Sequence, residues 1–361
     1  MRAVRFHGRE DIRIDEVEEP ICGYGQVKLQ VGSRSIGLGY IHEYLAGPMA
    51  VPVTPHAVTG EKLPTTLGHE FSGTIEEIGS GVTGLKVGDR VAIKPNLSDG
   101  TCSRCLVGRF NSCENLGFIG YSGKAGGLSD HVVVDTKHAI PLPDSITLDI
   151  GALTAGNTAL VEPLSVAWHA VSRSPLQEHD TVLVVGAGPI GLAIIQVLRA
   201  KGISNIIAVE VSEKRREFAL SLGATEVLNP LEVDVVARVR SVTGDAGGAS
   251  IAFECSGVQA GLDTAMQGLR VRGTTVIVSL WEHKPVIDAF AVVLDEKHVT
   301  GAAVFDDGDF EAVIDAIASG KIQPRPMITS KIPMEDITEK GFKALIGERD
   351  KHVKILVDIS A

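Results

Sequence analysis

The segment from Thr181 to Leu198, TVLVVGAGPIGLAIIQVL, constrains the fold of this chain more than any other stretch. An apolar run of this length could nearly span a bilayer, but three glycines and a proline interrupt its middle. A β-strand, a glycine-rich turn and an α-helix account for it better, because G-x-G-x-x-G between an apolar strand and an amphipathic helix marks a dinucleotide site. We therefore expect the segment to bind a dinucleotide and not to cross a membrane.

Five residues of this turn are expected to contact the dinucleotide: Gly186, Gly188, Pro189, Ile190 and Gly191. The first glycine permits a tight turn, the second lets the backbone approach a pyrophosphate, and the third lets helix and strand pack closely. The pyrophosphate would lie at the helix N-terminus, where unpaired N–H groups and the helix dipole favour negative charge. The alternative is a glycine turn without a ligand.

Glu210 ends the next apolar strand, IIAVE, at the distance where a carboxylate binds a ribose diol. Because a carboxylate there repels a 2′-phosphate, the residue favours NAD over NADP. Arg215 and Arg216 lie close by on the following segment and weaken this preference. We expect NAD as the cofactor, with Arg215 near its ribose.

The rest of the chain shows two sequence patterns. Up to about residue 150, short alternating segments such as VKLQV and DRVAI lie between Gly, Asp and Pro turns, which is typical of β-structure. From about residue 165, strands alternate with room for helices, the pattern of a doubly wound parallel sheet. From about residue 306, the pattern indicates a return to the first domain. We predict an α/β protein of two domains, which suits a length of 361 residues.

Charge and composition limit the partners. The net charge of -11 argues against a phosphate-backbone partner, since counterion release needs a basic face. No run of Lys and Arg suggests an anionic membrane surface. The N-terminus, MRAVRFHGRED, has no apolar region typical of a signal peptide. We expect a cytoplasmic protein with a small-molecule substrate and neither a nucleic-acid nor a membrane partner.

A cluster of cysteines follows the first β-rich segments. Asp99, Cys102, Cys105 and Cys113 form the pattern D-x2-C-x2-C-x7-C. In a cytosolic chain, close cysteines indicate a metal more often than a disulfide. A closed tetrahedral zinc site needs four ligands, and a carboxylate is an acceptable fourth beside three thiolates. We expect a structural zinc in a lobe at about residues 95–115; the alternative is a metal-free lobe that retains the thiols.

Longer motifs carry a family resemblance. Four segments resemble the zinc-dependent medium-chain dehydrogenase/reductase family: GHEFSGTIEEIGSGVTGLKVGDRV (68–91), the cysteine lobe, EPLSVAWHA (162–170) and GAGPIG (186–191). Within this family, three further segments resemble the (R,R)-2,3-butanediol dehydrogenase and sorbitol dehydrogenase branch: HEYLAGP (42–48), NLGFIGYSGKAGGLSDHVVV (115–134) and ITSKIPMEDITEKGFKALIGERDKHVKILVD (328–358). The resemblance covers nearly the whole chain.

The resemblance implies a fold and a reaction. A GroES-like, β-rich catalytic domain would comprise residues 1–164, a Rossmann NAD-binding domain 165–305, and a C-terminal return to the catalytic domain 306–361. Family members are usually homodimers or homotetramers. The family reaction is the reversible oxidation of a secondary alcohol to a ketone by NAD. Zinc on the oxygen acts as a Lewis acid, and the nicotinamide takes the hydride.

Carried over residue by residue, the resemblance implies a catalytic zinc site. His69 of LGHE matches a zinc ligand of the family, and Glu70 matches the glutamate that ligates the zinc or lies behind it. Glu162 of VEPLSV matches the glutamate that ligates the zinc or holds its water. The alternative is a buried polar pair with a core histidine. Because buried charges are normally paired or metal-bound, we expect a zinc site, with Glu70 and Glu162 taking part in catalysis.

The segment SIGLGYIHEY (35–44) departs from the family pattern G-I-C-G-[ST]-D-[LIV]. The cysteine ligand falls on Gly37, the Ser or Thr that relays the substrate proton falls on Gly39, and the Asp falls on Tyr40. With Gly39 unable to relay protons, His42 is the best remaining proton carrier. The alternative is a surface or supporting histidine. A second departure precedes Glu162, where DIGALTAGNTALVEPLS is longer than the resemblance implies.

Three explanations of these departures stay open. The site is remodelled, with zinc held by His69, Glu70 and Glu162; or the metal is lost and other groups protonate the substrate; or segments 32–41 and 153–160 are errors in the translated gene. If the site is remodelled, loss of the thiolate makes the metal a harder acid, and we expect weaker zinc binding than in a relative with the cysteine. The leading prediction is a diol or secondary-alcohol dehydrogenase. The alternatives are a zinc-independent biosynthetic ketone or enoyl reductase and a catalytically impaired dinucleotide-binding homologue.

Overall fold

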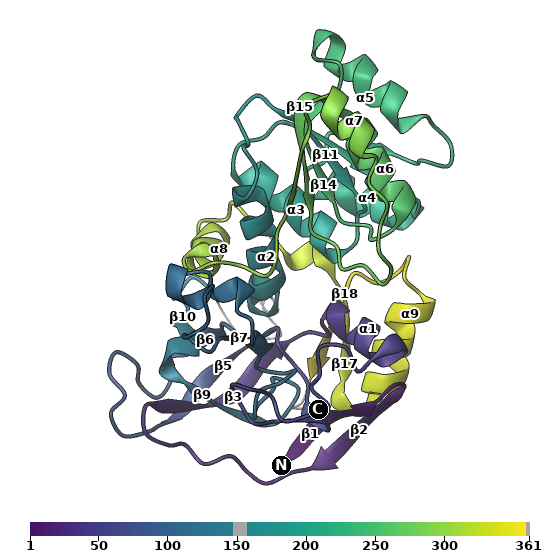
Figure 1. Ribbon diagram of the computed structural model, residues 1–361. Helices are drawn as coiled ribbons and strands as arrows, with labels where there is room; N and C mark the ends of the chain where they lie inside the picture. Colours follow the sequence, from purple (N-terminus) through teal and green to yellow (C-terminus); the bar gives the residue numbers. More distant parts are fainter. Residues whose placement is uncertain (147–156, 359–361) are drawn as a thin grey trace. The chain divides into compact units, whose positions relative to one another are not determined.

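The computed structural model describes residues 1–146 and 157–358 (Figure 1). The chain forms two compact units. Unit 1 comprises Met1–Glu162, Phe310–Ala318 and Ile328–Ala361. Unit 2 comprises Pro163–Asp309 and Ser319–Met327. Among the helices of the described ranges, none is both long and apolar enough to cross a membrane.

Unit 1 is built mainly from antiparallel strands. A five-stranded sheet has the order β10-β6-β5-β3-β9, and a three-stranded sheet has the order β2-β1-β4. Alternation places one face of β9 in the core, where Val132 and Val134 are buried between more exposed neighbours. The strands are β1 (Arg2–Gly8), β2 (Asp11–Glu16), β3 (Gln26–Arg34), β4 (Thr65–Thr66), β5 (Phe71–Ile78), β6 (Arg90–Ile93), β7 (Asn96–Leu97), β8 (Gly117–Phe118), β9 (His131–Asp135) and β10 (Ala139–Pro141).

The C-terminal strands belong to the same unit. The parallel pair β17 (Ile328–Pro333) and β18 (Lys354–Asp358) lies beside the end of β3, where the Ile36 N–H donates to the Ile355 carbonyl at 3.1 Å. A hydrophobic core cluster contains Phe6 and Tyr40 from the N-terminal part together with Phe342 and Ile355 from the C-terminal part. The helices of this unit are α1 (Leu38–Ala46), most of α8 (Asp309–Ala318) and α9 (Ala344–Gly347). This return brings the last strand against the segment that precedes β5.

Unit 2 contains the predicted doubly wound sheet. Its six parallel strands have the order β13-β12-β11-β14-β15-β16, in which the strand order reverses beside β11. Ligands of such sheets bind at this switch point, beyond the carboxyl ends of the strands. The strands are β11 (Thr181–Val185), β12 (Asn205–Val209), β13 (Glu226–Leu228), β14 (Ala249–Glu254), β15 (Leu269–Ile277) and β16 (His298–Gly301). The helices are α2 (Val161–Ser172), which begins in unit 1, α3 (Pro189–Ala200), α4 (Glu213–Ser221), α5 (Val235–Thr243), α6 (Gln259–Gln267) and α7 (Ala289–Leu294).

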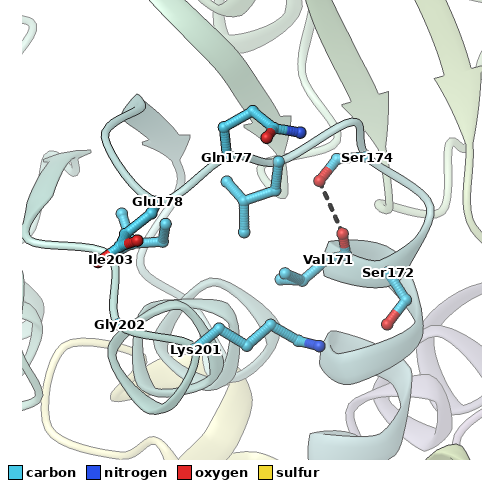
Figure 2. A pocket seen from close by; sticks show the side chains of 9 residues that line it. Val171, Ser172, Ser174, Gln177, Glu178, Lys201, Gly202 and Ile203 are labelled. Carbon is cyan, nitrogen blue, oxygen red and sulfur yellow. Dashed lines mark hydrogen bonds between the residues drawn. The ribbon is translucent and has the colours of Figure 1, made fainter.

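A pocket in unit 2 lies away from this switch point. Figure 2 shows its lining: Val171, Ser172, Ser174, Leu176, Gln177, Glu178, Lys201, Gly202 and Ile203. Gln177 and Glu178 precede β11, so the pocket is at the amino end of that strand. The Lys201 ammonium group is 4.1 Å from the centre of the Trp168 ring. The pocket is therefore separate from the dinucleotide turn at the other end of β11.

Candidate active site and metal-binding lobe

The glycine turn connects β11 to α3 as the sequence predicts. Gly186 has φ +95°, which only glycine adopts readily. A Cβ added to Gly191 would lie 1.9 Å from the Gly186 carbonyl oxygen, so this position requires close backbone approach. A Cβ on Gly188 would meet no atom within 4 Å, and Pro189 occupies the first position of α3. The turn thus has the shape that a pyrophosphate site needs.

Glu210 lies directly beside this turn. Its carboxylate accepts a hydrogen bond from the Ala187 N–H at 2.8 Å and another from the Ser212 N–H at 3.0 Å. Arg216 donates to the carbonyls of Glu210 and Val211, so its guanidinium is held by backbone oxygens. The Arg215 N–H contributes to the cap of α4 at Ser212. The structure thus brings the predicted carboxylate to the glycine turn, and backbone carbonyls hold the Arg216 guanidinium close by.

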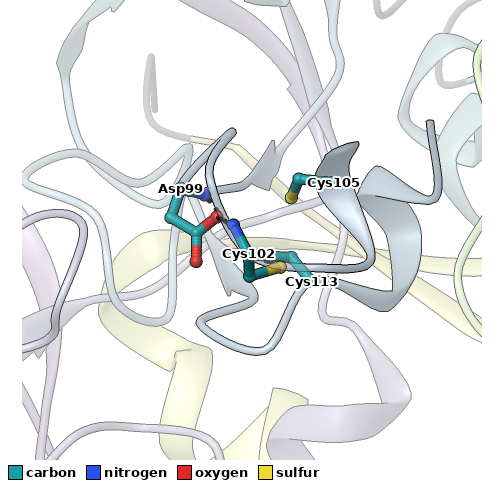
Figure 3. A group of neighbouring side chains, drawn as sticks. All are labelled: Asp99, Cys102, Cys105 and Cys113. Carbon is teal, nitrogen blue, oxygen red and sulfur yellow. Dashed lines mark hydrogen bonds between the residues drawn. The ribbon is translucent and has the colours of Figure 1, made fainter. Parts of the chain in front are cut away.

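The cysteine lobe gathers all four predicted ligands (Figure 3). One donor atom from each of Asp99, Cys102, Cys105 and Cys113 lies within 4.8 Å of the others. The Cys102 and Cys113 sulfurs are 4.0 Å apart, which is too long for a disulfide and close to the edge of a tetrahedron with bonds of about 2.3 Å. Asp99 also accepts hydrogen bonds from the Thr101 and Cys102 N–H groups, which fold the loop around its carboxylate.

The pKa values of the lobe thiols bear on whether it can hold a cation. Burial, followed by hydrogen bonds with the Cys102 and Cys113 thiols, raises the pKa of Cys105 to about 12. Hydrogen bonds from backbone N–H groups, led by that of Glu114, lower the pKa of Cys102. A bound divalent cation deprotonates coordinating thiols. Three thiols and one carboxylate at these separations therefore fit a zinc ion.

Replacing Cys105 with serine is expected to remove one zinc per chain and to lower the unfolding temperature, because a structural zinc contributes directly to folding energy. Elemental analysis of the purified protein and calorimetry measure the two effects. Cys22→Ser is the matched control, since the Cys22 thiol bonds to the Gln26 carbonyl outside the lobe. Equal metal content in both variants would exclude Cys105 as a ligand.

A second group of donors is buried in unit 1. One donor atom from each of His69, Glu70 and Glu162 lies within 4.8 Å of the others. His69 and Glu70 immediately precede β5, and Glu162 lies in the first turn of α2. The three side chains are buried. The structure therefore brings together the three residues that the resemblance implies for a catalytic metal.

Lys354, which sequence reasoning missed, completes this cluster. Its ammonium group lies 2.5 Å and 2.6 Å from the two carboxylate oxygens of Glu70, and the Ser35 hydroxyl also donates to Glu70. Lys354 is only 1% exposed. Burial opposes ionisation of Glu70, but the charge of Lys354 and the hydrogen bonds from Lys354 and Ser35 bring the Glu70 pKa below its ordinary value. The available signal was a lysine directly before three apolar residues in the last strand, KILVD.

Among the described residues, the other two donors form no ion pair as short as that between Lys354 and Glu70. Burial lowers the pKa of His69 to about 4, so its imidazole is neutral, and its Nδ1 is buried without a partner among the described residues. Burial, followed by the negative charge of Glu70, raises the pKa of Glu162 to about 8. A neutral imidazole with an unpaired nitrogen beside a carboxyl that resists ionisation fits a divalent cation, which would favour the carboxylate. We conclude that the donor set fits a zinc ion with an open coordination position.

The two glycines of the departing segment are closely packed. A Cβ added to Gly37 would lie 2.3 Å from Cε1 of His69, and one added to Gly39 would lie 2.1 Å from the Tyr121 hydroxyl oxygen. Aromatic rings therefore fill the space where the family has its thiolate and its relay hydroxyl. Tyr40 donates to the Gly120 carbonyl at 2.9 Å and accepts from the Gly68 N–H at 2.7 Å, which fixes the backbone before His69.

Two remaining sequence predictions concern neighbouring segments. His42 lies on α1 and is half-buried, and its role as a proton carrier stays a prediction. Its neighbour Glu43 accepts hydrogen bonds from the N–H groups of Met49, Ala50 and Val51, which fixes the following loop. Of the segment 153–160, residues 153–156 lie outside the described residues, and the rest forms the turn that leads into α2.

Metal-free protein is expected to lose stability as the pH rises from about 4.5 to about 8. Glu162 holds its proton more tightly in the folded protein than at the ordinary pKa of 4.5, so its contribution to stability is full below 4.5 and lost towards pH 8. Thermal unfolding in a chelator across this range, compared with Glu162→Gln, isolates the effect. Added zinc should stabilise the unsubstituted protein more than Glu162→Gln at pH 8, because zinc in the cysteine lobe stabilises both proteins and only the unsubstituted one keeps the Glu162 carboxylate. Parallel profiles for both proteins would show that Glu162 does not titrate in this way.

The fold and the two donor clusters define a class of protein: a dehydrogenase with a metal-bearing β-domain and a dinucleotide-binding sheet. Residues 45–144 match the alcohol dehydrogenase GroES-like domain, and residues 189–319 match the zinc-binding dehydrogenase domain. The chain belongs to the zinc-binding alcohol dehydrogenase family, and it is an oxidoreductase that acts on CH–OH groups. The predicted GroES-like and Rossmann folds are confirmed.

Individual relatives match over the full length. The (R,R)-butanediol dehydrogenase of Bacillus subtilis is 41% identical over 358 residues, which cover 99% of each chain. The (R,R)-butanediol dehydrogenase of Saccharomyces cerevisiae is 36% identical over 381 aligned positions, with 99% and 98% covered. The crystal structure of 2R,3R-butanediol dehydrogenase from Bacillus subtilis superposes with a TM-score of 0.91 at 40% identity, covering 99% of each chain. The predicted resemblance to this branch is therefore confirmed.

Proposed function

We propose that this protein interconverts a small vicinal diol and its hydroxyketone, such as 2,3-butanediol and acetoin, with NAD as the cofactor. The observation that carries the proposal is the buried cluster of His69, Glu70 and Glu162 in a chain with full-length similarity to butanediol dehydrogenases. The preference for NAD rests on Glu210, whose carboxylate at the glycine turn would repel a 2′-phosphate. The domain boundaries 1–164, 165–305 and 306–361 are part of this proposal.

The residues of the proposed metal site have different roles. His69 and Glu162 would hold a zinc ion, which acts as a Lewis acid on the substrate oxygen when bound. Lys354 and Ser35 hold Glu70 in place and balance its charge, so Glu70 orients the site more than it adds net charge. Bound NAD supplies the hydride chemistry, and the turn from Gly186 to Gly191 positions its pyrophosphate. His42 would exchange the substrate proton with water.

Turnover tests this proposal against its alternatives. Purified protein is mixed with NADH and either acetoin, diacetyl, a panel of simple ketones, or α,β-unsaturated ketones. Oxidation of NADH by acetoin or diacetyl supports the proposal. Reduction of only the carbon–carbon double bond of the unsaturated ketones would indicate an enoyl reductase. Binding of NADH without turnover on any ketone would indicate an impaired dinucleotide-binding homologue.

We also propose a homodimer or homotetramer with a cytoplasmic location, as family resemblance implies. Support for assembly comes from α7, which buries none of its apolar residues: Phe290 and Val293 are each 71% exposed. The helix precedes β16, the edge strand of the six-stranded sheet. Exposed apolar surface beside a sheet edge is typical of an interface.

Val293→Asp is expected to shift the protein to monomers, because a charge on the α7 surface opposes burial of this face. Light scattering after size-exclusion chromatography measures the mass. Val242→Asp, at an exposed position of α5 in the same unit, is the control and should leave the mass unchanged. An unsubstituted protein that is already monomeric would contradict the proposed assembly.

A further inference from the structure

We propose that Tyr121 replaces the hydroxyl side chain that is absent at position 39 and donates a hydrogen bond to the substrate oxygen. This inference rests on the proposed function. Its starting point is the position of the Tyr121 hydroxyl oxygen, which lies 2.1 Å from where a Cβ on Gly39 would be. A serine or threonine at 39 would start from this same volume. The Tyr121 hydroxyl group thus occupies the place that the side chain of a serine or threonine at position 39 would take.

Packing holds the Tyr121 ring in this position. Its centroid lies 4.5 Å from that of Tyr40, 4.9 Å from that of His69 and 6.0 Å from that of Phe118, whose ring packs edge to face with it. The side chain is buried to all but 7% of its surface. Because the ring packs between a core tyrosine and a proposed metal ligand, its side-chain conformation is restricted, and the packing sets the position of its hydroxyl group.

The two tyrosines of this stack differ in their hydroxyl groups. The Tyr40 hydroxyl is engaged by the Gly120 carbonyl and the Gly68 N–H. The Tyr121 hydroxyl has no hydrogen-bond partner among the described residues. Burial, followed by the charges of Glu43, Glu70 and Glu162, raises the pKa of Tyr121 well above its ordinary value, so the group stays a donor. The Tyr121 hydroxyl oxygen keeps some exposed surface, so an oxygen atom of a ligand can accept its hydrogen bond.

The reaction provides such a ligand atom. When a hydride and its electron pair reach a carbonyl carbon, the carbonyl π pair moves to the oxygen, which becomes negative and finally takes a proton derived from water. A fixed donor aimed at this oxygen stabilises the developing charge. Tyr121 supplies this hydrogen bond and keeps its own proton. The residue is therefore a catalytic residue in the proposed reaction.

Tyr121→Phe removes only the donor. Reduction of acetoin should lose about 10- to 100-fold in kcat/KM, the size expected for one hydrogen bond to a charged oxygen. The unfolding temperature should not fall, since the hydroxyl has no protein partner. Tyr44→Phe is the matched control, because the Tyr44 ring packs on Phe342 in the same core. It should leave kcat/KM unchanged.

Returning a hydroxyl to position 39 provides the reciprocal test. Gly39→Ser alone should impair the enzyme, because its Cβ collides with the Tyr121 hydroxyl. In Gly39→Ser combined with Tyr121→Phe, the nearest ring carbon is 3.4 Å from the new Cβ, which is ordinary contact. The double variant should recover kcat/KM to within about fivefold of the unsubstituted enzyme, the uncertainty of a re-formed hydrogen bond. A merely structural role would leave the double variant no better than either single one and would overturn the proposal.

Binding of isobutyramide to the NADH complex separates this inference from the proposed function. The amide carbonyl can accept the hydrogen bond but does not undergo reduction. Its dissociation constant, followed through NADH fluorescence, should rise in Tyr121→Phe and recover in the double variant, even if acetoin is not the substrate. Failure of acetoin turnover alone would count against the proposed function only. Equal amide affinity in all variants, or no amide binding at all, would overturn the role of Tyr121.

Discussion

Replacing Lys354 with methionine is expected to lower the free energy of unfolding by about 3–5 kcal/mol, the usual cost of removing one partner of a buried ion pair. Glu70 and Lys354 are 3% and 1% exposed, so water cannot take over the lost interaction. The carboxylate would then be buried against Glu162 without its cation. Denaturant unfolding of metal-free protein at neutral pH measures the change.

The matched control removes both charges. Glu70→Gln combined with Lys354→Met leaves no unpaired buried charge, and it should regain most of the stability lost in Lys354→Met. A surface ion pair such as Lys340–Asp336 offers a second comparison, since Lys340→Met should change stability by less than about 1 kcal/mol. If Lys354→Met unfolds no more easily than Lys340→Met, Glu70 is not held by a buried ion pair.

Replacing His69 with alanine is expected to abolish ketone reduction, with a loss on the order of 1,000-fold or more. Lewis-acid stabilisation of the oxygen contributes several kcal/mol, and each 1.4 kcal/mol is a factor of ten in rate. The same variant should lose one zinc per chain and retain the zinc of the cysteine lobe. Activity assays and elemental analysis of one preparation give both values.

His131→Ala is the control for this experiment. His131 is a half-buried histidine of unit 1, paired with Glu19 at 2.7 Å, and it lies in neither donor cluster. It should keep the metal content and the turnover of the unsubstituted protein. Unchanged metal content in His69→Ala, with turnover retained, would remove the second metal from the mechanism and favour the zinc-independent reductase.

Much of the fold could be predicted because its signals are local. The apolar strand, the glycine turn and Glu210 occupy one short stretch of sequence, and the spacing of Asp99 and the three cysteines determines their meeting in one loop. Family resemblance supplied His69, Glu70 and Glu162, which lie far apart in the chain but within 4.8 Å in space.

The charge balance and packing of the site could not be predicted in this way. Lys354 is 284 positions from Glu70, and only the return of the C-terminal strands to unit 1 brings them together. The filling of the glycine positions by His69 and Tyr121 likewise depends on side-chain packing across distant segments. The sequence shows that a thiolate and a hydroxyl are absent at Gly37 and Gly39, but it does not show what occupies their place.

The central claim is that the site retains a catalytic metal although residue 37 is glycine. The most direct measurement is NADH oxidation by acetoin before chelation, after chelation, and after zinc is added back at neutral pH. Our account predicts turnover that is lost on chelation and restored by zinc, at zinc concentrations higher than a site with a thiolate ligand requires. Turnover that survives complete removal of zinc would contradict it.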